Sequence, residues 1–375
     1  MLKVLHVITG LNQGGAEIAL MRLMLHEEKS HFSSEVFSLI GDGPVARSMR
    51  NAGLTTLNCG AAQHLLGASL VSLVRHCRRT RPDIIQGWMY HGNLAATLAA
   101  KAANVRRHGW NVRCSLDERL EARWGTRSAV KMGALLSPLA HWIIYNSQRA
   151  AGQHKERGYD CLHATVIPNG FDCNALGPDS QLRTSLREQL KISPDQIIVG
   201  TLARWHPQKD YPTLIRAAAE VCQRFPQSCF VGIGRGVDWM NRMLLQQIDG
   251  FGIRDHFRLL GEVPDGSRHA VMFDINVLAS AFGEGFPNAI AEGMACGVPC
   301  VGTDVGDTGR IIGSTGCLVP PSDYQALSAA ICQLISLPPE ERLRLGAAAR
   351  ERVAHEFTIE QNVAAYSKLF RGGAA

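Results

Sequence analysis

Short runs of β-branched and other apolar residues alternate with longer amphipathic stretches along the 375-residue sequence. This alternation predicts repeated strand–helix–strand units, because a strand buried on both faces appears as a short apolar run and its connecting helix as a longer amphipathic one. The expected fold class is therefore α/β, with doubly wound parallel sheets. Strands are predicted at residues 4–9, 35–39, 55–58, 83–86, 142–145, 197–202, 229–233, 257–260, 275–278 and 299–302. Helices are predicted at residues 17–28, 45–52, 70–79, 94–103, 211–224, 240–250, 267–273 and 288–296.

The length indicates two domains, because 375 residues exceed what one hydrophobic core usually supports. The boundary is predicted near Pro168, which fixes φ, and Asn169-Gly170, which favours a tight turn. The predicted segments are an N-terminal Rossmann-like domain at residues 1–168, a C-terminal Rossmann-like domain at 169–356, and a final helix at 357–375 that packs back on the N-terminal domain.

No secretory or membrane-spanning segment is predicted. Residues 1–9 alternate like a buried strand and run into glycines, without a long apolar core or a small-residue cleavage site. The most apolar later stretch, residues 129–145, is interrupted by Lys131, Pro138 and His141, which disfavours a bilayer span. A cytoplasmic location is therefore expected. The eleven cysteines are scattered without a Cys-x-x-Cys pair, which favours buried hydrophobic side chains over a zinc site or a disulfide framework.

The positive charge is concentrated in the first half of the chain. Residues 1–165 carry 20 Lys and Arg against 11 Asp and Glu, a net charge of +9, whereas the remainder carries −3. A basic first half suits phosphorylated ligands or an anionic membrane surface, with peripheral attachment to the inner face of the cytoplasmic membrane. A solvated, arginine-rich surface is the alternative. Nucleic acid is not an expected partner, because no aromatic-basic motif accompanies the charge.

The first glycine-rich loop follows the first predicted strand and opens a helix. It reads Gly-Leu-Asn-Gln-Gly-Gly-Ala-Glu at residues 10–17. Gly14 and Gly15 allow a close backbone approach, and a helix N-terminus presents free N–H groups to a phosphate. The dinucleotide-binding pattern Gly-x-Gly-x-x-Gly is absent, so a simple tight turn is an equal alternative.

A second loop follows the first strand of the second half and contains Arg204 and Lys209. Two cations at the carboxyl end of a strand can hold a pyrophosphate. The alternative is a pair of solvated surface charges, but the position in a loop beyond a strand favours a functional role.

The third motif, Gly-Glu-Gly-Phe-Pro-Asn-Ala-Ile-Ala-Glu at residues 283–292, is the most informative. Pro287 suits the first turn of a helix, so Glu284 is expected in the loop and Glu292 about one turn inside the helix. Both carboxylates can then face one cleft and accept hydrogen bonds from sugar and ribose hydroxyls. The alternative, two solvated glutamates, is disfavoured by the apolar surroundings.

Here the chain resembles family 4 of the GT-B glycosyltransferases. The resemblance rests on Glu284 and Glu292 in an E-x7-E pair and on the segment 295–299, Ala-Cys-Gly-Val-Pro. It extends over nearly the whole chain, through the segments 14–17, 167–172, 204–209, 232–236 and 260–263. It implies two Rossmann-like domains facing a central cleft, with the acceptor side in the N-terminal domain and the nucleotide-sugar site in the C-terminal domain.

The resemblance also implies roles for individual residues. Arg204 and Lys209 would hold the donor diphosphate, Glu284 the donor sugar and Glu292 the ribose. Further donor contacts are implied for Phe286, Pro287, Asn288, the backbone near Val263, and Gly14 and Gly15. Such enzymes retain the anomeric configuration and need no metal or other cofactor; the sequence contains no Asp-x-Asp motif.

One position departs from the family pattern. Residues 88–93 and 110–116 match a subgroup of the family in which the residue after the arginine is usually histidine, whereas here Cys114 follows Arg113. His91 is the candidate to act in place of that histidine at the acceptor side, although a lone histidine is often structural. Arg113 is predicted to face the donor phosphate or an anionic acceptor. Cys114 is not predicted to be a catalytic thiol, since nothing nearby would lower its pKa.

The leading hypothesis is a retaining, metal-independent glycosyltransferase. Its donor would be a nucleotide-diphosphate sugar and its acceptor a glycan, lipid-linked or glycolipid molecule in polysaccharide, lipopolysaccharide or other cell-envelope biosynthesis. The predicted catalytic residues are Glu284, Arg204, Lys209 and His91. Two alternatives are a GT-B-fold nucleotide-sugar epimerase and a non-catalytic glycosyltransferase-like partner subunit, which Cys114 alone encourages.

Overall fold

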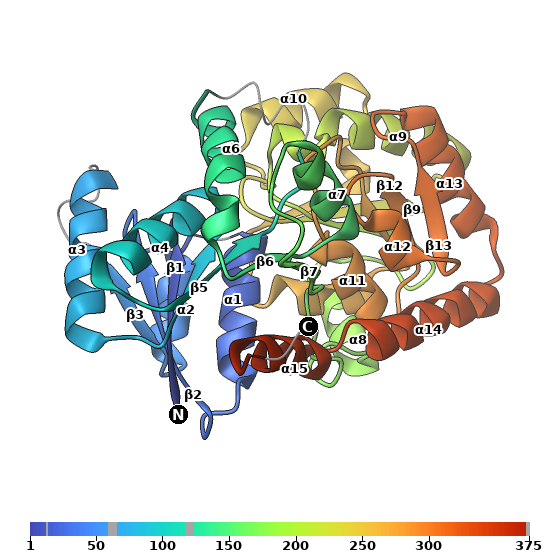
Figure 1. Cartoon of the computed structure of the whole chain (residues 1–375). Helices are drawn as coiled ribbons and strands as arrows, with labels where there is room; N and C mark the ends of the chain where they lie inside the picture. Colours follow the sequence, from blue (N-terminus) through green and yellow to red (C-terminus); the bar gives the residue numbers. More distant parts are fainter. Residues whose placement is uncertain (13, 59–65, 117–123, 373–375) are drawn as a thin grey trace. The chain divides into compact units, whose positions relative to one another are not determined.

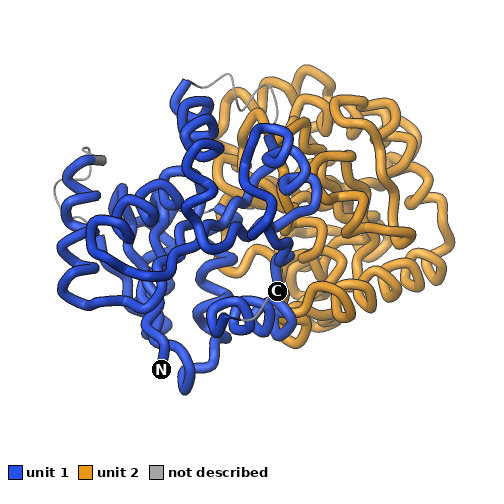
Figure 2. The backbone as a smooth tube through the Cα atoms, in the orientation of Figure 1, with its two compact units in different colours: residues 1–170, 359–375 blue, residues 171–358 orange. Residues whose placement is uncertain are grey.

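The computed structural model describes residues 1–12, 14–58, 66–116 and 124–372. The chain divides into two compact units, shown in blue and orange in Figure 2. Unit 1 comprises residues 1–170 and 359–375, and unit 2 comprises residues 171–358. Each is an α/β unit with a parallel sheet, which confirms the predicted fold class.

The described sheet of unit 1 has seven parallel strands in the order β3-β2-β1-β4-β5-β6-β7. The strand order reverses between β1 and β4, so loops that follow these two strands meet at a topological switch point, where ligands bind in such sheets. The strands are β1 (Leu2–Ile8), β2 (Phe32–Ser38), β3 (Thr55–Asn58), β4 (Ile84–Trp88), β5 (Arg107–Val112), β6 (Trp142–Tyr145) and β7 (Ala164–Val166).

Helices cover both faces of this sheet because the strands are apolar on both faces. In β1, Val4 and Ile8 point to one core and Leu5 and Val7 to another, as the two-residue period of a strand requires. The helices of unit 1 are α1 (Gly15–His26), α2 (Pro44–Asn51), α3 (Leu66–Thr80), α4 (Met89–Ala103), α6 (Trp124–Leu136), the short 3₁₀ helix η2 (Ser137–Leu139), α7 (Gln148–Glu156) and α15 (Ile359–Phe370).

The helix α15 comes from the end of the described chain but belongs to the core of unit 1. It lies against α1 (Figure 1). Its Tyr366 stacks on Trp88 with ring centroids 6.2 Å apart, and Phe370 is buried in the same core. Both side chains fill space beside β1 and β4, so this face of the sheet is incomplete without α15.

Unit 2 has six described parallel strands in the order β10-β9-β8-β11-β12-β13. The strands are β8 (Ile197–Leu202), β9 (Ser228–Ile233), β10 (Phe257–Gly261), β11 (Ile275–Leu278), β12 (Cys300–Thr303) and β13 (Gly316–Val319). Its helices are α8 (Ser180–Gln189), η3 (Pro207–Lys209), α9 (Tyr211–Arg224), α10 (Arg242–Gly250), η4 (Arg254–His256), η5 (Gly266–Met272), α11 (Asn288–Ala295), α12 (Thr308–Ile312), α13 (Tyr324–Ser336) and α14 (Pro339–Glu356). One core packs α9, α10 and α13 on the sheet, and the other packs α8, α11 and α14.

One predicted helix differs in type. Residues 267–273 were expected to be α-helical, but η5 is a 3₁₀ helix whose hydrogen bonds span three residues, such as Arg268 N–H to the Asp265 carbonyl at 2.8 Å. A 3₁₀ helix rises more per residue than an α-helix.

The chain passes between the two units twice, at the junctions 170–171 and 358–359, and the two crossing segments are hydrogen-bonded to each other. Within unit 1, Asn362 donates a hydrogen bond to the Pro168 carbonyl at 2.5 Å. Within unit 2, the Phe171 N–H donates to the Phe357 carbonyl at 2.9 Å, and Phe171 forms a β-bridge with Thr358. Each unit thus holds both crossing segments on its own side of the junctions 170–171 and 358–359.

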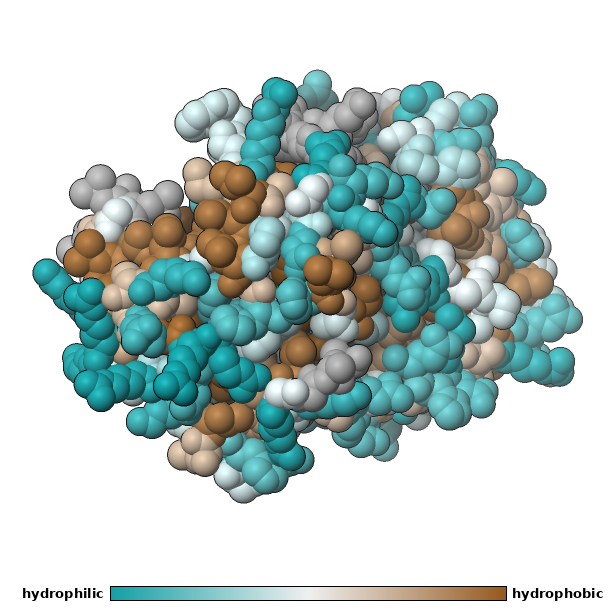
Figure 3. Space-filling model, viewed as in Figure 1, coloured by the Kyte–Doolittle hydropathy of each residue, from teal (hydrophilic) through white to brown (hydrophobic). Residues whose placement is uncertain are grey.

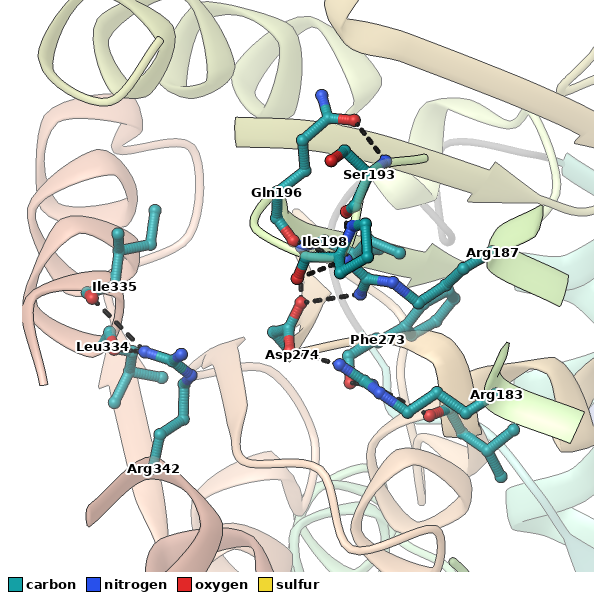
Figure 4. Close-up of polar contacts among 12 residues, drawn as sticks. Arg183, Arg187, Ser193, Gln196, Ile198, Phe273, Asp274, Leu334, Ile335 and Arg342 are labelled. Carbon is teal, nitrogen blue, oxygen red and sulfur yellow. Dashed lines mark hydrogen bonds and ion pairs between the residues drawn. The ribbon is translucent and has the colours of Figure 1, made fainter. Parts of the chain in front are cut away.

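A cluster of charged side chains fixes α8 to the sheet of unit 2 (Figure 4). The carboxylate of Asp274, just before β11, forms ion pairs with Arg183 at 2.6 Å and Arg187 at 3.3 Å, both from α8. The same carboxylate accepts the Ile198 N–H of β8 at 2.7 Å. Asp274 therefore joins one helix and two strands at the amino edge of the sheet.

Candidate active site

The predicted catalytic residues of unit 2 lie at the carboxyl edge of its sheet. Arg204 and Lys209 follow β8, and Glu284 follows β11. Because β8 and β11 are neighbours in the sheet, their loops emerge side by side. This edge is where parallel α/β sheets bind ligands.

Lys209 and Glu284 form an ion pair, with Nζ 2.5 Å from Oε1. Only 13% and 9% of the two side chains are exposed, so solvent screens the pair weakly. The Ser280 hydroxyl donates to the same Oε1 at 2.6 Å. Among the described residues no hydrogen bond reaches Oε2 of Glu284, so this oxygen is available to a ligand.

Local capping interactions aim Lys209 at the carboxylate. The His206 side chain accepts the Gln208 N–H at 3.2 Å and so caps the short helix η3. Asp210 then adopts a left-handed conformation, with φ of 46°, and caps α9. The Gln208 carbonyl accepts the Ala281 N–H at 2.8 Å, which joins this loop to the one that carries Glu284.

Arg204 lies in the same loop, half-buried, with its Nη2 3.2 Å from the Gln208 side-chain oxygen. The neighbouring loop after β9 holds its backbone, because the Trp205 N–H donates to the Arg235 carbonyl at 2.8 Å. Gly234 allows this close approach: a Cβ there would overlap the Ala203 carbonyl, and its φ is 150°. Arg204 and Lys209 thus lie on one loop, whose backbone is hydrogen-bonded to the loop after β9.

The helix α11 carries the second glutamate. Pro287 is its N-cap residue and Asn288 its first residue, so Glu284 lies in the preceding loop and Glu292 inside the helix, as predicted. Phe286 is buried, with its ring against Phe171 and Phe357 of unit 2. Val263 follows β10 at the same edge and packs partly against the core.

Sequence reasoning missed four residues that shape the Glu284 loop: Ser280, Thr303, Gly306 and Asp307. Thr303, at the end of β12, donates to the Ser280 carbonyl at 2.6 Å. The Asp307 N–H donates to the Gly285 carbonyl at 2.9 Å, and a Cβ on Gly306 would overlap the carbonyl oxygens of Glu284 and Gly285. Their position after β11 and β12 is a signal that could have found them, since the carboxyl ends of adjacent strands meet at one edge.

We expect Ser280→Ala to lower turnover of a nucleotide-sugar donor by about 10- to 100-fold, because a hydrogen bond to a buried charged group contributes roughly 1.5–3 kcal/mol. Steady-state kinetics with unchanged thermal unfolding would check this. Ser328→Ala is the matched control, since Ser328 is also buried and donates to a carboxylate, that of Glu220, away from the Glu284 loop. Equal losses in both variants would mean that the effect is on folding rather than on Glu284.

In unit 1, the loops after β1 and β4 emerge at the switch point. Gly14 is the N-cap residue of α1 and Gly15 its first residue. A Cβ on Gly14 would meet the carboxylate of Glu17, which is the end of a flexible side chain and can move aside. His91 is exposed in the first turn of α4, directly after β4.

Arg113 is buried in unit 1, just beyond the end of β5. Its Nη2 donates to the Asn169 side-chain oxygen, its guanidinium lies 5.1 Å from the centre of the Trp88 ring, and it hydrogen-bonds to Tyr366. Burial lowers the pKa of Arg113. Arg113 therefore connects the end of β5 with a crossing segment and with α15.

Cys114 faces the opposite core of unit 1. Its thiol lies 3.4 Å from the Tyr90 hydroxyl, which lies 2.9 Å from Nε2 of His154. The other nitrogen of His154 lies 2.7 Å from the Ala150 carbonyl. Burial raises the pKa of Tyr90. Cys114 thus belongs to a buried hydrogen-bonded network that includes Tyr90, the neighbour of His91 in the first turn of α4.

Neither a metal cluster nor a membrane span is found in the part of the chain that the structure describes. No group of three or more His, Cys, Asp or Glu side chains among these residues is arranged to hold a metal ion. None of the described helices is both long enough and apolar enough to cross a bilayer.

Two family models match the chain. The model described as Glycosyltransferase Family 4 matches residues 13–175, and the model described as Glycosyl transferases group 1 matches residues 194–336. The first match covers most of unit 1 and the second most of unit 2. The second contains the loops of Arg204, Lys209 and Glu284.

Curated relatives align with parts of the chain. N-acetyl-alpha-D-glucosaminyl L-malate synthase of Bacillus anthracis is 28% identical over 189 residues, which are 50% of this chain and 48% of that protein. D-inositol 3-phosphate glycosyltransferase of Rhodococcus erythropolis is 28% identical over 240 residues, 62% of this chain and 53% of that protein. The chain thus spans about half the length of these relatives.

A solved structure matches along the entire chain. Anabaena HepE in complex with UDP-glucose superposes with a TM-score of 0.86 at 20% sequence identity, covering 99% of this chain and 100% of that one. At this identity the likeness establishes the fold, which is GT-B.

Proposed function

The chain belongs to glycosyltransferase family 4, and from this premise we propose that it is a retaining transferase that moves a sugar from a nucleotide-diphosphate sugar to an acceptor hydroxyl. In this reaction the bond between the anomeric carbon and the diphosphate oxygen breaks, and its electron pair stays on the departing diphosphate. A bond forms between the anomeric carbon and the acceptor oxygen, whose proton passes to the departing diphosphate.

The ion pair of Lys209 and Glu284, with Arg204 on the same loop, is the observation that carries the proposal. Negative charge grows on the diphosphate as the bond breaks, and cations fixed in advance stabilise that charge without reorganisation. Lys209 and Arg204 can both supply this charge from the loop after β8. Glu284, anchored through Oε1, keeps Oε2 for a hydroxyl of the donor sugar.

The remaining predicted residues receive roles within the proposal. Glu292 binds the ribose hydroxyls, the backbone near Val263 contacts the base, and the amides at the start of α11, from Phe286 through Pro287 to Asn288, add to the donor site. Gly14 and Gly15 approach the phosphates from unit 1. His91 acts at the acceptor side, and Arg113 supports the loop beyond β5 or faces an anionic group of the donor or acceptor.

The acceptor is proposed to be a glycan, lipid-linked or glycolipid molecule of cell-envelope biosynthesis. Two features support an anionic or membrane-bound acceptor. One is the charge of +9 in residues 1–165, and the other is that the names of two relatives contain the anionic compounds L-malate and D-inositol 3-phosphate. The proposed location is cytoplasmic, with peripheral attachment to the inner membrane face. The chain's own cations supply the charge at the diphosphate, so no metal is required by the proposal.

A panel of nucleotide sugars tests the proposal. The enzyme is incubated with each nucleotide sugar, and the nucleoside diphosphate released by slow hydrolysis is measured. Calorimetry measures the binding of the nucleoside diphosphate. We expect Arg204→Ala to reduce release by about 10²-fold or more, and Glu292→Ala to weaken donor binding by about 30-fold or more, since a desolvated charged contact contributes roughly 2–5 kcal/mol. Arg242→Ala and Glu351→Ala, at exposed positions of unit 2 outside the proposed donor site, are the controls. Wild-type rates in both site variants would overturn the assignment, and an epimerised donor in an acceptor-free incubation would favour the epimerase.

A further inference from the structure

The connection between β13 and α13 in unit 2 reaches both of the loops that carry the Lys209–Glu284 ion pair. This connection, residues 319–322 (Val-Pro-Pro-Ser), is termed the β13–α13 bracket. Its two central residues are prolines, whose rings fix φ and leave the backbone little freedom. The two ends of the bracket are therefore held at a restricted separation.

The last residue of the bracket, Ser322, contacts the loop of Lys209. Its hydroxyl donates to Oδ2 of Asp210 at 2.9 Å, and Asp210 directly follows Lys209. The same carboxylate oxygen accepts the Thr213 hydroxyl of α9 at 2.9 Å. Ser322 and Asp210 both have a left-handed backbone, with φ of 58° and 46°. This conformation is costly outside glycine and persists only where its surroundings hold it, so the turn after Lys209 depends on the contacts of Asp210.

The first residue of the bracket, Val319, contacts the segment that supports Glu284. Its carbonyl accepts the Asp304 N–H at 2.8 Å. Asp304 directly follows Thr303, whose hydroxyl donates to the Ser280 carbonyl at 2.6 Å. The Ser280 hydroxyl in turn donates to Oε1 of Glu284. One end of the bracket is thus linked to the carboxylate of the ion pair, and the other end to its cation.

The helix after the bracket is fixed beside α9, which follows the Lys209 loop. The Arg216 guanidinium of α9 lies 4.0 Å from the centre of the ring of Tyr324, the first residue of α13. The Asp323 side chain accepts the Ala326 N–H at 2.9 Å and so caps α13 directly after the bracket. The two helices pack in the same core and lie side by side (Figure 1). This packing keeps Ser322 within reach of Asp210.

The outward surface around the bracket is ordinary. Figure 3 shows hydrophilic and hydrophobic residues interspersed over the part of unit 2 that carries β13 and α13. Scattered exposed hydrophobic side chains, such as Leu318 of β13, are normal on folded proteins and do not by themselves mark a partner site. The informative contacts of the bracket are therefore those with the two loops of the ion pair.

We propose that the β13–α13 bracket is a positioning element of the donor site, with Ser322 and Asp210 as positioning residues for Lys209. The bracket acts through Lys209 and Glu284 rather than on the donor itself. A cation fixed in advance stabilises the departing diphosphate without reorganisation, and small misplacements of such groups are costly. The expected effect on turnover rests on the proposed function, whereas the ordering of the Lys209 loop can be measured without a donor.

Variants of Ser322 test the proposal on the full chain. Ser322→Gly removes the hydroxyl and still permits the left-handed backbone, so the hydrogen bond to Asp210 is the contact that is lost. We expect kcat for nucleoside diphosphate release to fall about 3- to 10-fold, the scale of one hydrogen bond. KM for the donor should change less than about twofold, because the charge on the diphosphate grows only in the transition state. Ser322→Asn should restore kcat, since asparagine tolerates this conformation and its amide can donate.

Ser193→Gly is the matched control. Ser193 is also exposed and donates to an aspartate, Asp195, but it precedes β8 at the amino edge of the sheet. Its kcat and KM should equal those of the wild type. Thermal unfolding of Ser322→Gly and Ser193→Gly should also match the wild type, because each variant loses one exposed hydrogen bond.

Hydrogen exchange followed by mass spectrometry gives a readout that needs no donor. In Ser322→Gly, the peptide that contains residues 206–210 should exchange about 3- to 10-fold faster than in the wild type, in proportion to the lost hydrogen bond. The Ala281 N–H, which donates to the Gln208 carbonyl, should exchange faster as well. Peptides from the middle of α13 should be unchanged.

Several results would overturn the inference. Unchanged exchange at residues 206–210 in Ser322→Gly would show that Ser322 does not hold the Lys209 loop. Faster exchange with unchanged kcat would show that this order has no role in turnover, and equal losses in Ser193→Gly would make the effect a general one. If the wild type releases no nucleoside diphosphate from any nucleotide sugar, the proposed function fails, and hydrogen exchange still decides whether the bracket holds the loop.

Discussion

Replacing Lys209 with methionine is expected to lower turnover of a nucleotide-sugar donor by roughly 10²–10³-fold, the effect of removing one partner of a desolvated charge pair. The variant loses the cation closest to Glu284 and leaves that carboxylate buried without its ion pair. Steady-state release of nucleoside diphosphate measures the effect. Lys191→Met, an exposed lysine of unit 2, is the control and should match the wild type.

A double-mutant cycle with Glu284→Gln sharpens this prediction. If the two residues act as one unit, Lys209→Met/Glu284→Gln should be little worse than the more damaged single variant, because groups that act together have non-additive effects. Fully additive losses would show that Lys209 and Glu284 contribute independently, so the ion pair would not be the functional arrangement. Unchanged turnover in Lys209→Met would remove Lys209 from the site.

Asp274→Ala is expected to destabilise unit 2 by about 3 kcal/mol, because it leaves two arginines of α8 without their carboxylate and one strand N–H without its acceptor. Side-chain exposure is only 14% for Asp274 and 9% for Arg187, so water replaces these contacts poorly. Urea unfolding followed by circular dichroism would measure the change in midpoint.

Asp249→Ala is the matched control for this second prediction. Asp249 also pairs with an arginine, Arg254, but both side chains are about half exposed. Exposed ion pairs contribute little, so the midpoint should stay close to that of the wild type. Equal shifts for Asp274→Ala and Asp249→Ala would show that the cluster around Asp274 has no special stabilising role.

The fold class was predictable from the sequence because buried parallel strands leave continuous apolar runs. β8, β11 and α9 begin and end where the sequence predicts. β5 was missed: its sequence, Arg-His-Gly-Trp-Asn-Val, mixes charged, polar and apolar residues. It is a strand because its neighbours β4 and β6 supply hydrogen bonds on both sides, and such pairing is a property of the folded sheet. Helices α13 and α14 were also missed.

The site was predictable to the extent that motifs mark it. The loops of Arg204, Lys209 and Glu284 follow neighbouring strands, and the structure brings Lys209 and Glu284 into contact. The contribution of Ser280 and Gly306 could not be derived, because single small residues carry no pattern and their roles depend on distances across loops. For Arg113, the sequence suggested a contact with an anion. In the structure its hydrogen-bond partners include Asn169 and Tyr366, which are 56 and more than 200 residues away in the chain, so the sequence pattern did not indicate them. The predicted cleft between the domains, and the roles given to His91, Gly14 and Gly15, stay predictions.

The position of α15 has a consequence for how the protein is made. Unit 2 is one continuous stretch of chain, residues 171–358, so every residue of its two cores leaves the ribosome before α15 does. Most of unit 1 is synthesised first, yet its core is complete only when Tyr366 and Phe370 have been added, and these residues leave the ribosome after all of unit 2. A premature stop codon just before α15 would therefore leave unit 2 intact and expose the apolar core of unit 1.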